Sequence, residues 1–293
     1  MTVSGGRAVG TVMVVTAALS WGTWSLFVRP SNAPPWVAAA LPLLLMGLFT
    51  LPLVALDRRP LVWNRRTVWL VIGMGALAGC NLLTFFAAMT VTTVAIATLT
   101  HYAAPLLVAL LAPRLENERI RGAPLAAAVG LVGLALIMVP GGDGGAGRVW
   151  LGGLLGFASA VSYALLVFVV RRLGPRIGEA RVISYQGLVA GLLLAPFAVP
   201  ELGAIDAGMV GYLSIGALVP GAVGGLLFVR GLERVGSSRA AVLAFAEPVC
   251  AVAIGWMFWN EGLGPLAAVG AACIVVAGVW VSRSPATYST DSV

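Results

Sequence analysis

Ten runs of about twenty apolar residues follow one another along this chain, and they constrain its fold more than any other feature. The runs lie at about 9–28, 35–56, 67–88, 91–112, 122–140, 149–170, 181–199, 208–230, 237–258 and 263–282. A helix that rises about 1.5 Å per residue needs roughly twenty residues to cross the hydrocarbon core of a bilayer. Only 10% of the residues are charged, against about 25% in an average soluble domain. We therefore predict an all-α membrane protein with ten transmembrane helices.

The basic residues lie almost entirely on one side of the predicted bundle. All 18 of them are arginine, and with ten spans 16 fall on the side that carries both termini, which leaves Arg29 and Arg148 for the other side. Because basic loops stay in the cytoplasm, we expect both termini there. The net charge of +7 then reflects loops that face anionic lipid, and it requires no nucleic-acid partner.

The chain repeats itself at an offset of 143 residues. The offset aligns WLVIG (69–73) with YLSIG (212–216), Phe85 with Phe228, Pro105 with Pro248, and Asn117-Glu118 with Asn260-Glu261. A repeat of five spans, an odd number, inserts its second copy in the opposite orientation. We therefore predict a first repeat at 1–143, an inverted second repeat at 144–284 and a cytoplasmic tail at 285–293, with a central cavity between the repeats.

The segment AFAEPVCAVAIGWMFWNEGLGPLAAVGAACIVVAGV (244–279) resembles the EamA repeat of the drug/metabolite transporter superfamily. The Glu-Pro pair, the following Asn-Glu pair and the Gly-rich last span carry the resemblance, which extends over nearly the whole chain. It implies an exporter of amino acids or other small metabolites in a bacterial inner membrane, most similar to YddG-like aromatic amino-acid exporters. The four-span members of the superfamily carry an acidic coupling residue in their first span. Here that span has no carboxylate, so proton coupling stays open.

The stretch TLTHYAAPLLV (100–110) contains the only histidine of the chain, in the middle of a predicted span. Thr98 and Pro105 lie on the same helix face as His101, and Tyr102 lies on its flank. Because unpaired polar groups are costly in hydrocarbon, such side chains face the bundle interior or a wet cavity. We therefore predict that His101, Tyr102 and Thr98 line a central substrate cavity, beside a kink at Pro105.

Glu247 is the only carboxylate inside a predicted span, and it precedes Pro248, the repeat-related partner of Pro105. It is either a structural acid that satisfies backbone groups at the kink or a substrate-binding or coupling group. Pro105, Pro248 and Pro220, in VPGAVGG (219–225), are candidate gating positions, with simple bending of the helix as the alternative.

Other spans place polar and aromatic side chains at a similar depth, several of them in pairs at i, i+4 spacing. Packing against lipid or at the membrane interface is the alternative for each aromatic residue. The remaining candidates for substrate binding are Ser20, Trp21, Trp24, Asn81, Phe85, Ser159, Ser162, Tyr163 and Phe245.

Several absences narrow the function. No basic residue lies in the core of a predicted span, which disfavours strongly anionic cargo. The chain has no phosphate-binding loop, catalytic triad or metal-ligand spacing, so we predict neither an enzyme nor a cofactor or metal site.

We predict a secondary exporter of small neutral or zwitterionic metabolites, with aromatic or bulky neutral amino acids favoured, that works by alternating access. The alternatives are a proton-coupled multidrug cation exporter that uses Glu247 and a non-transporting membrane scaffold. We expect the partners of the predicted exporter to be a small-molecule substrate and the lipid bilayer. The oligomeric state stays open, and a monomer would be sufficient for this function.

Overall fold

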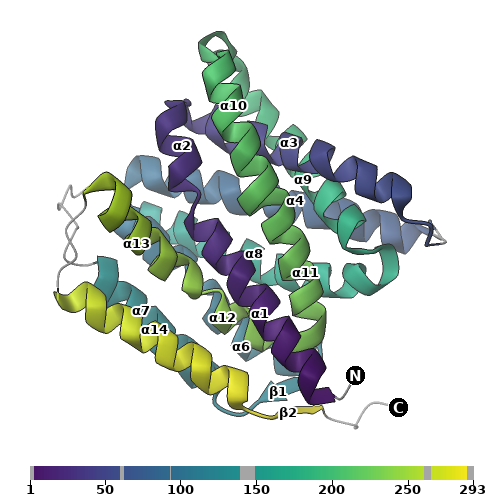
Figure 1. Ribbon diagram of the computed structural model, residues 1–293, viewed down its shortest axis with the longest axis vertical. Helices are drawn as coiled ribbons and strands as arrows, with labels where there is room; N and C mark the ends of the chain where they lie inside the picture. Colours follow the sequence, from purple (N-terminus) through teal and green to yellow (C-terminus); the bar gives the residue numbers. More distant parts are fainter. Residues whose placement is uncertain (1–2, 60–62, 93, 139–148, 261–264, 289–293) are drawn as a thin grey trace.

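The computed structural model describes residues 3–59, 63–92, 94–138, 149–260 and 265–288, and these residues are mostly helical (Figure 1). The helices of the first half are α1 (Val3–Gly22), α2 (Ser25–Ser31), α3 (Pro35–Leu56), α4 (Arg65–Val91), α5 (Val94–His101), α6 (Ala104–Leu115) and α7 (Ala123–Met138). Those of the second half are α8 (Val149–Ile177), α9 (Glu179–Ala198), η2 (Val199–Ala204), α10 (Ala207–Gly216), η3 (Ala217–Val223), α11 (Gly224–Val235), α12 (Ser237–Leu243), α13 (Ala246–Trp259) and α14 (Pro265–Arg283). Two short strands, β1 (Glu118–Ile120) and β2 (Ala286–Tyr288), complete the fold.

The helices follow the apolar runs of the sequence. Within the described residues, seven helical segments are long and apolar enough to cross a membrane, and α7 and α14 contain shorter apolar helices. The run at 91–112 is divided between α5 and α6. These segments confirm the prediction of a predominantly helical, multi-pass membrane protein.

Within the described residues, four of the predicted spans are interrupted along their length. The α5–α6 and α12–α13 breaks each come just before a proline, Pro105 or Pro248, which cannot donate a backbone hydrogen bond to the preceding turn. The span at 208–230 contains instead the π-helical segment η3, which includes Pro220. The first span is interrupted between Gly22 and Ser25.

The break in the first span packs against the first turn of α13. A Cβ atom on Gly22 would lie 2.6 Å from the carbonyl oxygen of Glu247 and 2.5 Å from the Cβ of Cys250. Only glycine allows backbones to approach so closely. The break after α1 and the break before α13 therefore lie side by side.

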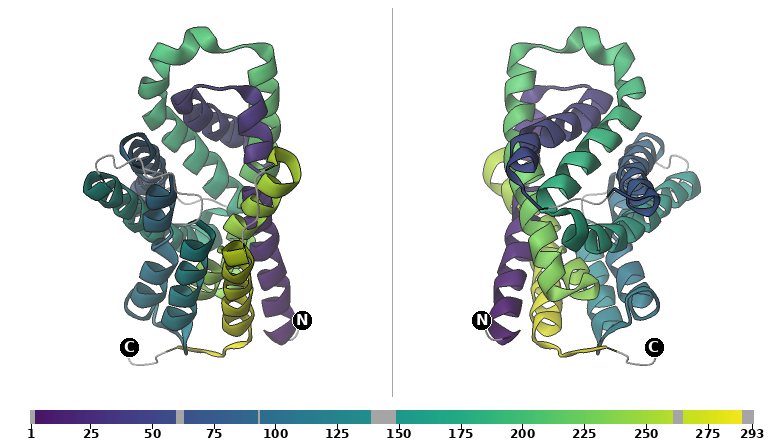
Figure 2. Two further views of the ribbon diagram at one scale, coloured as in Figure 1. Left: turned by 90° about the vertical axis from the view of Figure 1, so that its left-hand side faces the viewer. Right: turned by 90° about the vertical axis from the view of Figure 1, so that its right-hand side faces the viewer.

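The most extensive packing joins helices of the first half to helices of the second. α1 packs on α11, α3 on α9, α4 on α8, α6 on α12, and α7 on α14. The largest buried cluster accordingly mixes the halves, with Met74 and Val108 packed among residues such as Val167 and Leu232. The halves therefore interlock across a shared core (Figure 2).

Strands β1 and β2 pair in antiparallel register, Glu118 with Tyr288, Arg119 with Thr287 and Ile120 with Ala286. The predicted tail at 285–293 thus contains a paired strand. Figure 1 shows the pair at one end of the molecule, beside both marked chain ends and far from α2 and α10. We call the end that carries β1, β2 and the last turns of α6, α8, α11 and α14 the sheet face.

Candidate substrate cavity

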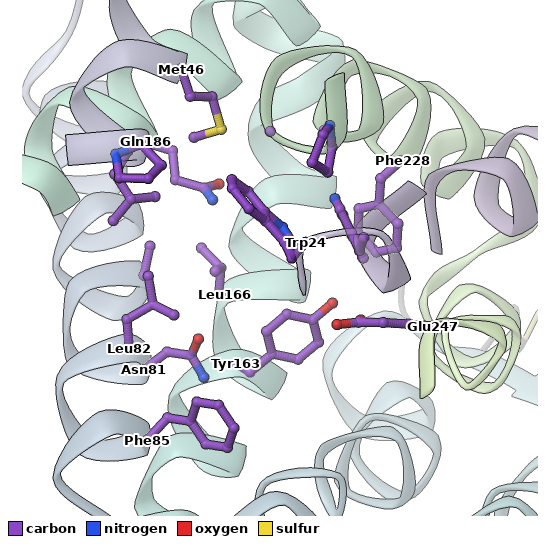
Figure 3. Close-up of a pocket in the computed structure, with 18 of the residues that line it drawn as sticks. Trp24, Met46, Asn81, Leu82, Phe85, Tyr163, Leu166, Gln186, Phe228 and Glu247 are labelled. Atoms are coloured by element: carbon purple, nitrogen blue, oxygen red, sulfur yellow. The ribbon is translucent and has the colours of Figure 1, made fainter. Parts of the chain in front are cut away.

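A cavity of about 440 Å³ lies between helices of both halves, and Figure 3 shows part of its wall. All four interrupted spans contribute to this wall, through residues such as Trp24, Tyr102, Pro220 and Ala244. Irregular backbone at membrane depth is tolerated where it lines a cavity or is buried in protein. The breaks in the helices and the position of the cavity therefore have a common explanation.

The wall of the cavity is mainly aromatic and aliphatic. Seven aromatic side chains line it: Trp21, Trp24, Phe85, Phe86, Tyr102, Tyr163 and Phe228. The polar side chains of the wall besides the tyrosines are Asn81, His101, Gln186 and Glu247. Among the described lining residues Glu247 is the only carboxylate and none is an arginine. The cavity therefore offers a large apolar surface with a few separated polar groups.

Ten of the predicted site residues lie on this wall. They are Trp21, Trp24, Asn81, Phe85, His101, Tyr102, Tyr163 and Glu247, together with the candidate gating residues Pro105 and Pro220. They come from both halves of the chain, and the most distant of them, Trp21 and Glu247, lie 226 positions apart in the sequence.

The other predicted residues lie off the wall, and the reasons are local. Ser20 and Ser162 donate to carbonyl oxygens of their own helices, at 2.8 Å to Ala17 and 3.0 Å to Ala158, a common alternative for serine in a helix. Phe245 is fully buried and stacks on Tyr102 with 5.9 Å between ring centroids. The remaining three predicted residues outside the lining are Thr98, Ser159 and Pro248.

Ser159 lies buried behind the wall and connects two residues that line it. Its Oγ lies 2.8 Å from Nδ1 of His101 and accepts a 2.8 Å hydrogen bond from Nδ2 of Asn81. The Asn81 amide also donates to the Ser159 carbonyl oxygen at 3.0 Å. These bonds join α4, α5 and α8, so the two polar side chains are held in fixed positions on the wall.

Aromatic rings fix His101 from the cavity side. Its ring centroid lies 4.8 Å from that of Phe85, 5.3 Å from that of Tyr102 and 5.8 Å from that of Tyr163. Two of these contacts are edge-to-face, the geometry that aromatic pairs favour. The imidazole is thus one member of an aromatic cluster and also the end of the Asn81–Ser159 hydrogen-bond network.

Glu247 lies in the first turn of α13, where the helix dipole stabilises a negative charge. Its side chain lies near that of Tyr102, and Figure 3 shows the hydroxyl group of Tyr163 directed toward the carboxylate. The break before α13 creates this helix start inside the membrane-spanning region. Glu247 can therefore stabilise the start of α13, and it can also accept hydrogen bonds from a ligand at the edge of the cavity.

Sequence reasoning missed several wall residues. Gln186 is the only glutamine of the chain and lies in a predicted span, a signal similar to that of His101. Phe228 is the repeat-related partner of Phe85, and its ring lies 5.0 Å from that of Trp21. Met46 and Phe86 have no such signal. Within the described part of the chain, no group of three or more His, Cys, Asp or Glu side chains is placed to bind a metal ion.

Known proteins resemble this chain over nearly its whole length. The sequence profile of the EamA-like transporter family matches residues 8–139 and again 150–283. An uncharacterized transporter of Archaeoglobus fulgidus is 30% identical over 282 residues, which cover 93% of this chain and 96% of that protein. The uncharacterized transporter YwfM of Bacillus subtilis is 26% identical over 95% of each chain. A crystal structure with 25% sequence identity superposes with a TM-score of 0.79 over 94% of this chain and 98% of its own.

Proposed function

Because this chain belongs to the EamA-like transporter family, and is thus a multi-pass membrane transporter, we propose that it exports aromatic or bulky neutral amino acids. The observation that carries this choice of cargo is the aromatic wall of the cavity. Small-molecule sites commonly have volumes of about 300–1,000 Å³, and the cavity of about 440 Å³ suits a single amino acid.

The aromatic rings favour a flat apolar side chain in the cargo. Offset and edge-to-face ring contacts contribute about 0.5–1.5 kcal/mol each beyond burial of apolar area. Phe228 lies on one side of the cavity, with the ring of Trp21 5.0 Å from it, and Phe85 and Tyr163 lie on another. A tryptophan or phenylalanine side chain between them makes several such contacts, whereas a threonine side chain makes none.

The polar wall residues match the two ends of a zwitterion without strong fixed charge. Glu247, with the hydroxyl groups of Tyr102 and Tyr163, accepts hydrogen bonds from an ammonium group. The amides of Asn81 and Gln186 donate to a carboxylate. Because no arginine lines the cavity within the described residues, a phosphorylated or dianionic cargo lacks a cationic partner.

The transport mechanism proposed here is alternating access between two inverted repeats of five spans, at 1–143 and 144–284. The pairing of α1 with α11 and of α4 with α8 supports this proposal, because a pseudo-two-fold axis between the repeats would produce both pairs. The α5–α6 and α12–α13 breaks occupy equivalent places in the two repeats and supply pivots. The arginine distribution supports a bacterial inner-membrane location with both termini in the cytoplasm.

Counterflow in proteoliposomes tests the cargo. Trp21→Ala and Tyr163→Ala should each weaken transport of labelled tryptophan about tenfold, which corresponds to ~1.4 kcal/mol, and should affect threonine less. Trp69→Ala is the matched control, because Trp69 is 61% exposed on the outside of the bundle. Equal losses for tryptophan and threonine, or no loss for either, would remove the aromatic pocket from the proposal.

A second candidate cargo is an aromatic organic cation, exported in exchange for protons. Glu247 favours it, because this carboxylate is the only one among the described lining residues and none of them is an arginine. If Glu247 is a coupling site, Glu247→Gln should abolish transport of tetraphenylphosphonium driven by a pH gradient and leave counterflow of the same cation intact. If counterflow and thermal stability fall together, Glu247 has a structural role.

A further inference from the structure

The cavity extends unequally towards the two ends of the molecule. Away from the sheet face, its lining reaches Val28 near the end of α2 and Ala38 near the start of α3. Towards the sheet face the lining ends at Val170 of α8 and Val229 of α11. The residue after Val170 is Arg171, which belongs to a buried group of charges. A layer of charged side chains thus lies between the cavity and the sheet face.

Glu118 is the centre of this layer. Its side chain is fully buried, and its Oε2 accepts hydrogen bonds from the Arg171 guanidinium and, at 3.1 Å, from the backbone N–H of Ser237. Arg171 also pairs with Glu116 at 2.5 Å. One carboxylate thereby joins β1 to the last turns of α8 and to the first turn of α12. We call Glu116, Glu118, Arg171 and Ser237 the Glu118 cluster.

Gly236 shows how closely the chain fits around this carboxylate. Its φ of +86° lies in the region that favours glycine, and a Cβ atom there would collide with the Glu118 carboxylate. The α11–α12 connection is therefore shaped to hold Glu118. Helix α11 lines the cavity through Phe228 and Val229, so this connection links the cluster to the wall.

Arg239 ties the same region to the end of α14. Its side chain is 1% exposed, and its guanidinium donates to the carbonyl oxygens of Val281 at 2.9 Å, of Val235 at 3.0 Å and of Ser284. Two residues beyond Ser284, β2 begins its pairing with β1, the strand that carries Glu118. The C-terminal strand and Arg239 therefore reach the cluster from two directions.

Burial distinguishes this layer from the exposed ion pairs of the molecule, although Arg181 and Asp57 also form a largely buried pair, with side chains 8% and 17% exposed. Arg59 and Arg230 pair with Glu179, but their side chains are 54% and 49% exposed, and exposed pairs contribute little to stability. Buried pairs are costly to desolvate and are often replaceable by apolar residues without loss of stability. A buried ion pair differs from an apolar contact, because water can solvate the two charges once they separate. Such a pair therefore suits a contact that opens and closes.

From this arrangement we propose that the Glu118 cluster is the gate that closes the cavity towards the sheet face, and that β2 is the latch that holds it. Opening the cavity on this side separates β1 from α8 and from the start of α12 and breaks the Glu118 contacts. The proposal goes beyond the choice of cargo, because it concerns access to the cavity and requires no particular substrate.

Access can be measured with a reporter cysteine in the cavity. Val167 lines the cavity one helical turn from Arg171, and Val167→Cys in a variant whose three native cysteines are changed to serine supplies one thiol. A membrane-impermeant maleimide is applied to right-side-out and to inside-out vesicles, with a C-terminal tag identifying the sheet face. With the gate intact, we expect this cysteine to react slowly from that face.

Two gate variants should accelerate this labelling. Glu118→Ala removes the contacts to Arg171 and Ser237, and deletion of residues 285–293 removes the latch. Each should increase the labelling rate from the sheet face roughly tenfold, which corresponds to ~1.4 kcal/mol. The deletion keeps the proposal testable if Glu118→Ala does not fold, and thermal unfolding in detergent reports the folded fraction of both.

The matched control is Glu201→Ala. Glu201 also binds backbone N–H groups, those of Trp36 at 3.1 Å and Val37 at 3.2 Å, but it does so at the start of α3, away from the sheet face. It should leave labelling from the sheet face unchanged. The gate proposal fails if folded Glu118→Ala and deletion variants label at the parental rate, or if Glu201→Ala accelerates labelling equally.

Discussion

At the scale of single residues, His101 is positioned by Ser159, which does not line the cavity. Spacing along the helices grouped Asn81, His101 and Tyr163 each with other candidates on one face, because residues three or four apart share a face, and all three line the cavity. Spacing alone did not show that Ser159 lies behind the wall and not on it. From there Ser159 is hydrogen-bonded to Asn81 and His101. Which side of a shared face points inward depends on the neighbouring helix, and the local sequence does not contain that information.

Ser159→Ala should destabilise the protein by about 1–3 kcal/mol, because it removes the buried hydroxyl that is hydrogen-bonded to Nδ1 of His101 and to the amide of Asn81. Ser162→Ala, one turn along the same helix, removes a hydroxyl that bonds only a carbonyl oxygen of its own helix, and should change stability by less than about 0.5 kcal/mol. Thermal unfolding in detergent measures both. Equal effects of the two changes would show that the Ser159 network contributes nothing specific.

Glu116 gives a prediction for pH dependence. Burial raises the pKa of Glu116 despite the opposing effect of Arg171. The folded protein therefore binds this proton more tightly than the unfolded chain, so stability should fall as pH rises from the usual glutamate pKa through the raised one. Glu116→Gln should flatten this part of a curve of melting temperature against pH. A slope that steepens in the variant would contradict the assigned cause.

At the scale of secondary-structure elements, the breaks in the helices differ in how far the sequence predicts them. Pro105 and Pro248 predict the α5–α6 and α12–α13 breaks by removing a backbone donor. The break between α1 and α2 has no proline in its turn. It coincides with the contact of Gly22 with α13, a tertiary contact between segments more than two hundred residues apart. A local pattern cannot reveal such a cause.

Gly22→Ala tests that explanation. The added Cβ would overlap the Glu247 carbonyl oxygen and Cys250, and overpacking of this kind costs typically about 1–3 kcal/mol. Gly73→Ala is the control, because a Cβ on Gly73 in α4 meets nothing within 4 Å. It should be neutral or stabilising by up to about 1 kcal/mol, since alanine favours helices over glycine. Unfolding in detergent measures both, and a neutral Gly22→Ala would show that the two breaks do not depend on close contact.

At the scale of the whole molecule, the apolar runs predicted a multi-pass helical protein because hydrocarbon imposes helix length and composition directly. They gave no sign of β2, since a three-residue strand in a polar segment carries too little periodicity to be recognised. Nor did they indicate which helices pair across the halves. That pairing depends on the fit of small and large side chains over the whole bundle, and short sequence windows do not contain it.

The predicted topology can be tested by cysteine accessibility in intact cells. The substitutions are Arg58→Cys and Arg176→Cys in the cysteine-free background, at two positions that the arginine distribution predicts to be cytoplasmic. Both should react with an impermeant reagent only after the cells are opened. Reaction of either in intact cells would overturn the orientation and, with it, the inverted repeat.

The pairing of β1 with β2 also sets an order of events during synthesis of the protein. β1 follows α6 in the first half, but its hydrogen-bond partner follows α14. A growing chain on the ribosome can insert its early helices one after another, yet β1 has to wait without its partner until nearly all of the protein has been translated. The β1–β2 pair is therefore among the last contacts to form. A chain whose synthesis stops before β2 lacks the strand that we propose as the latch.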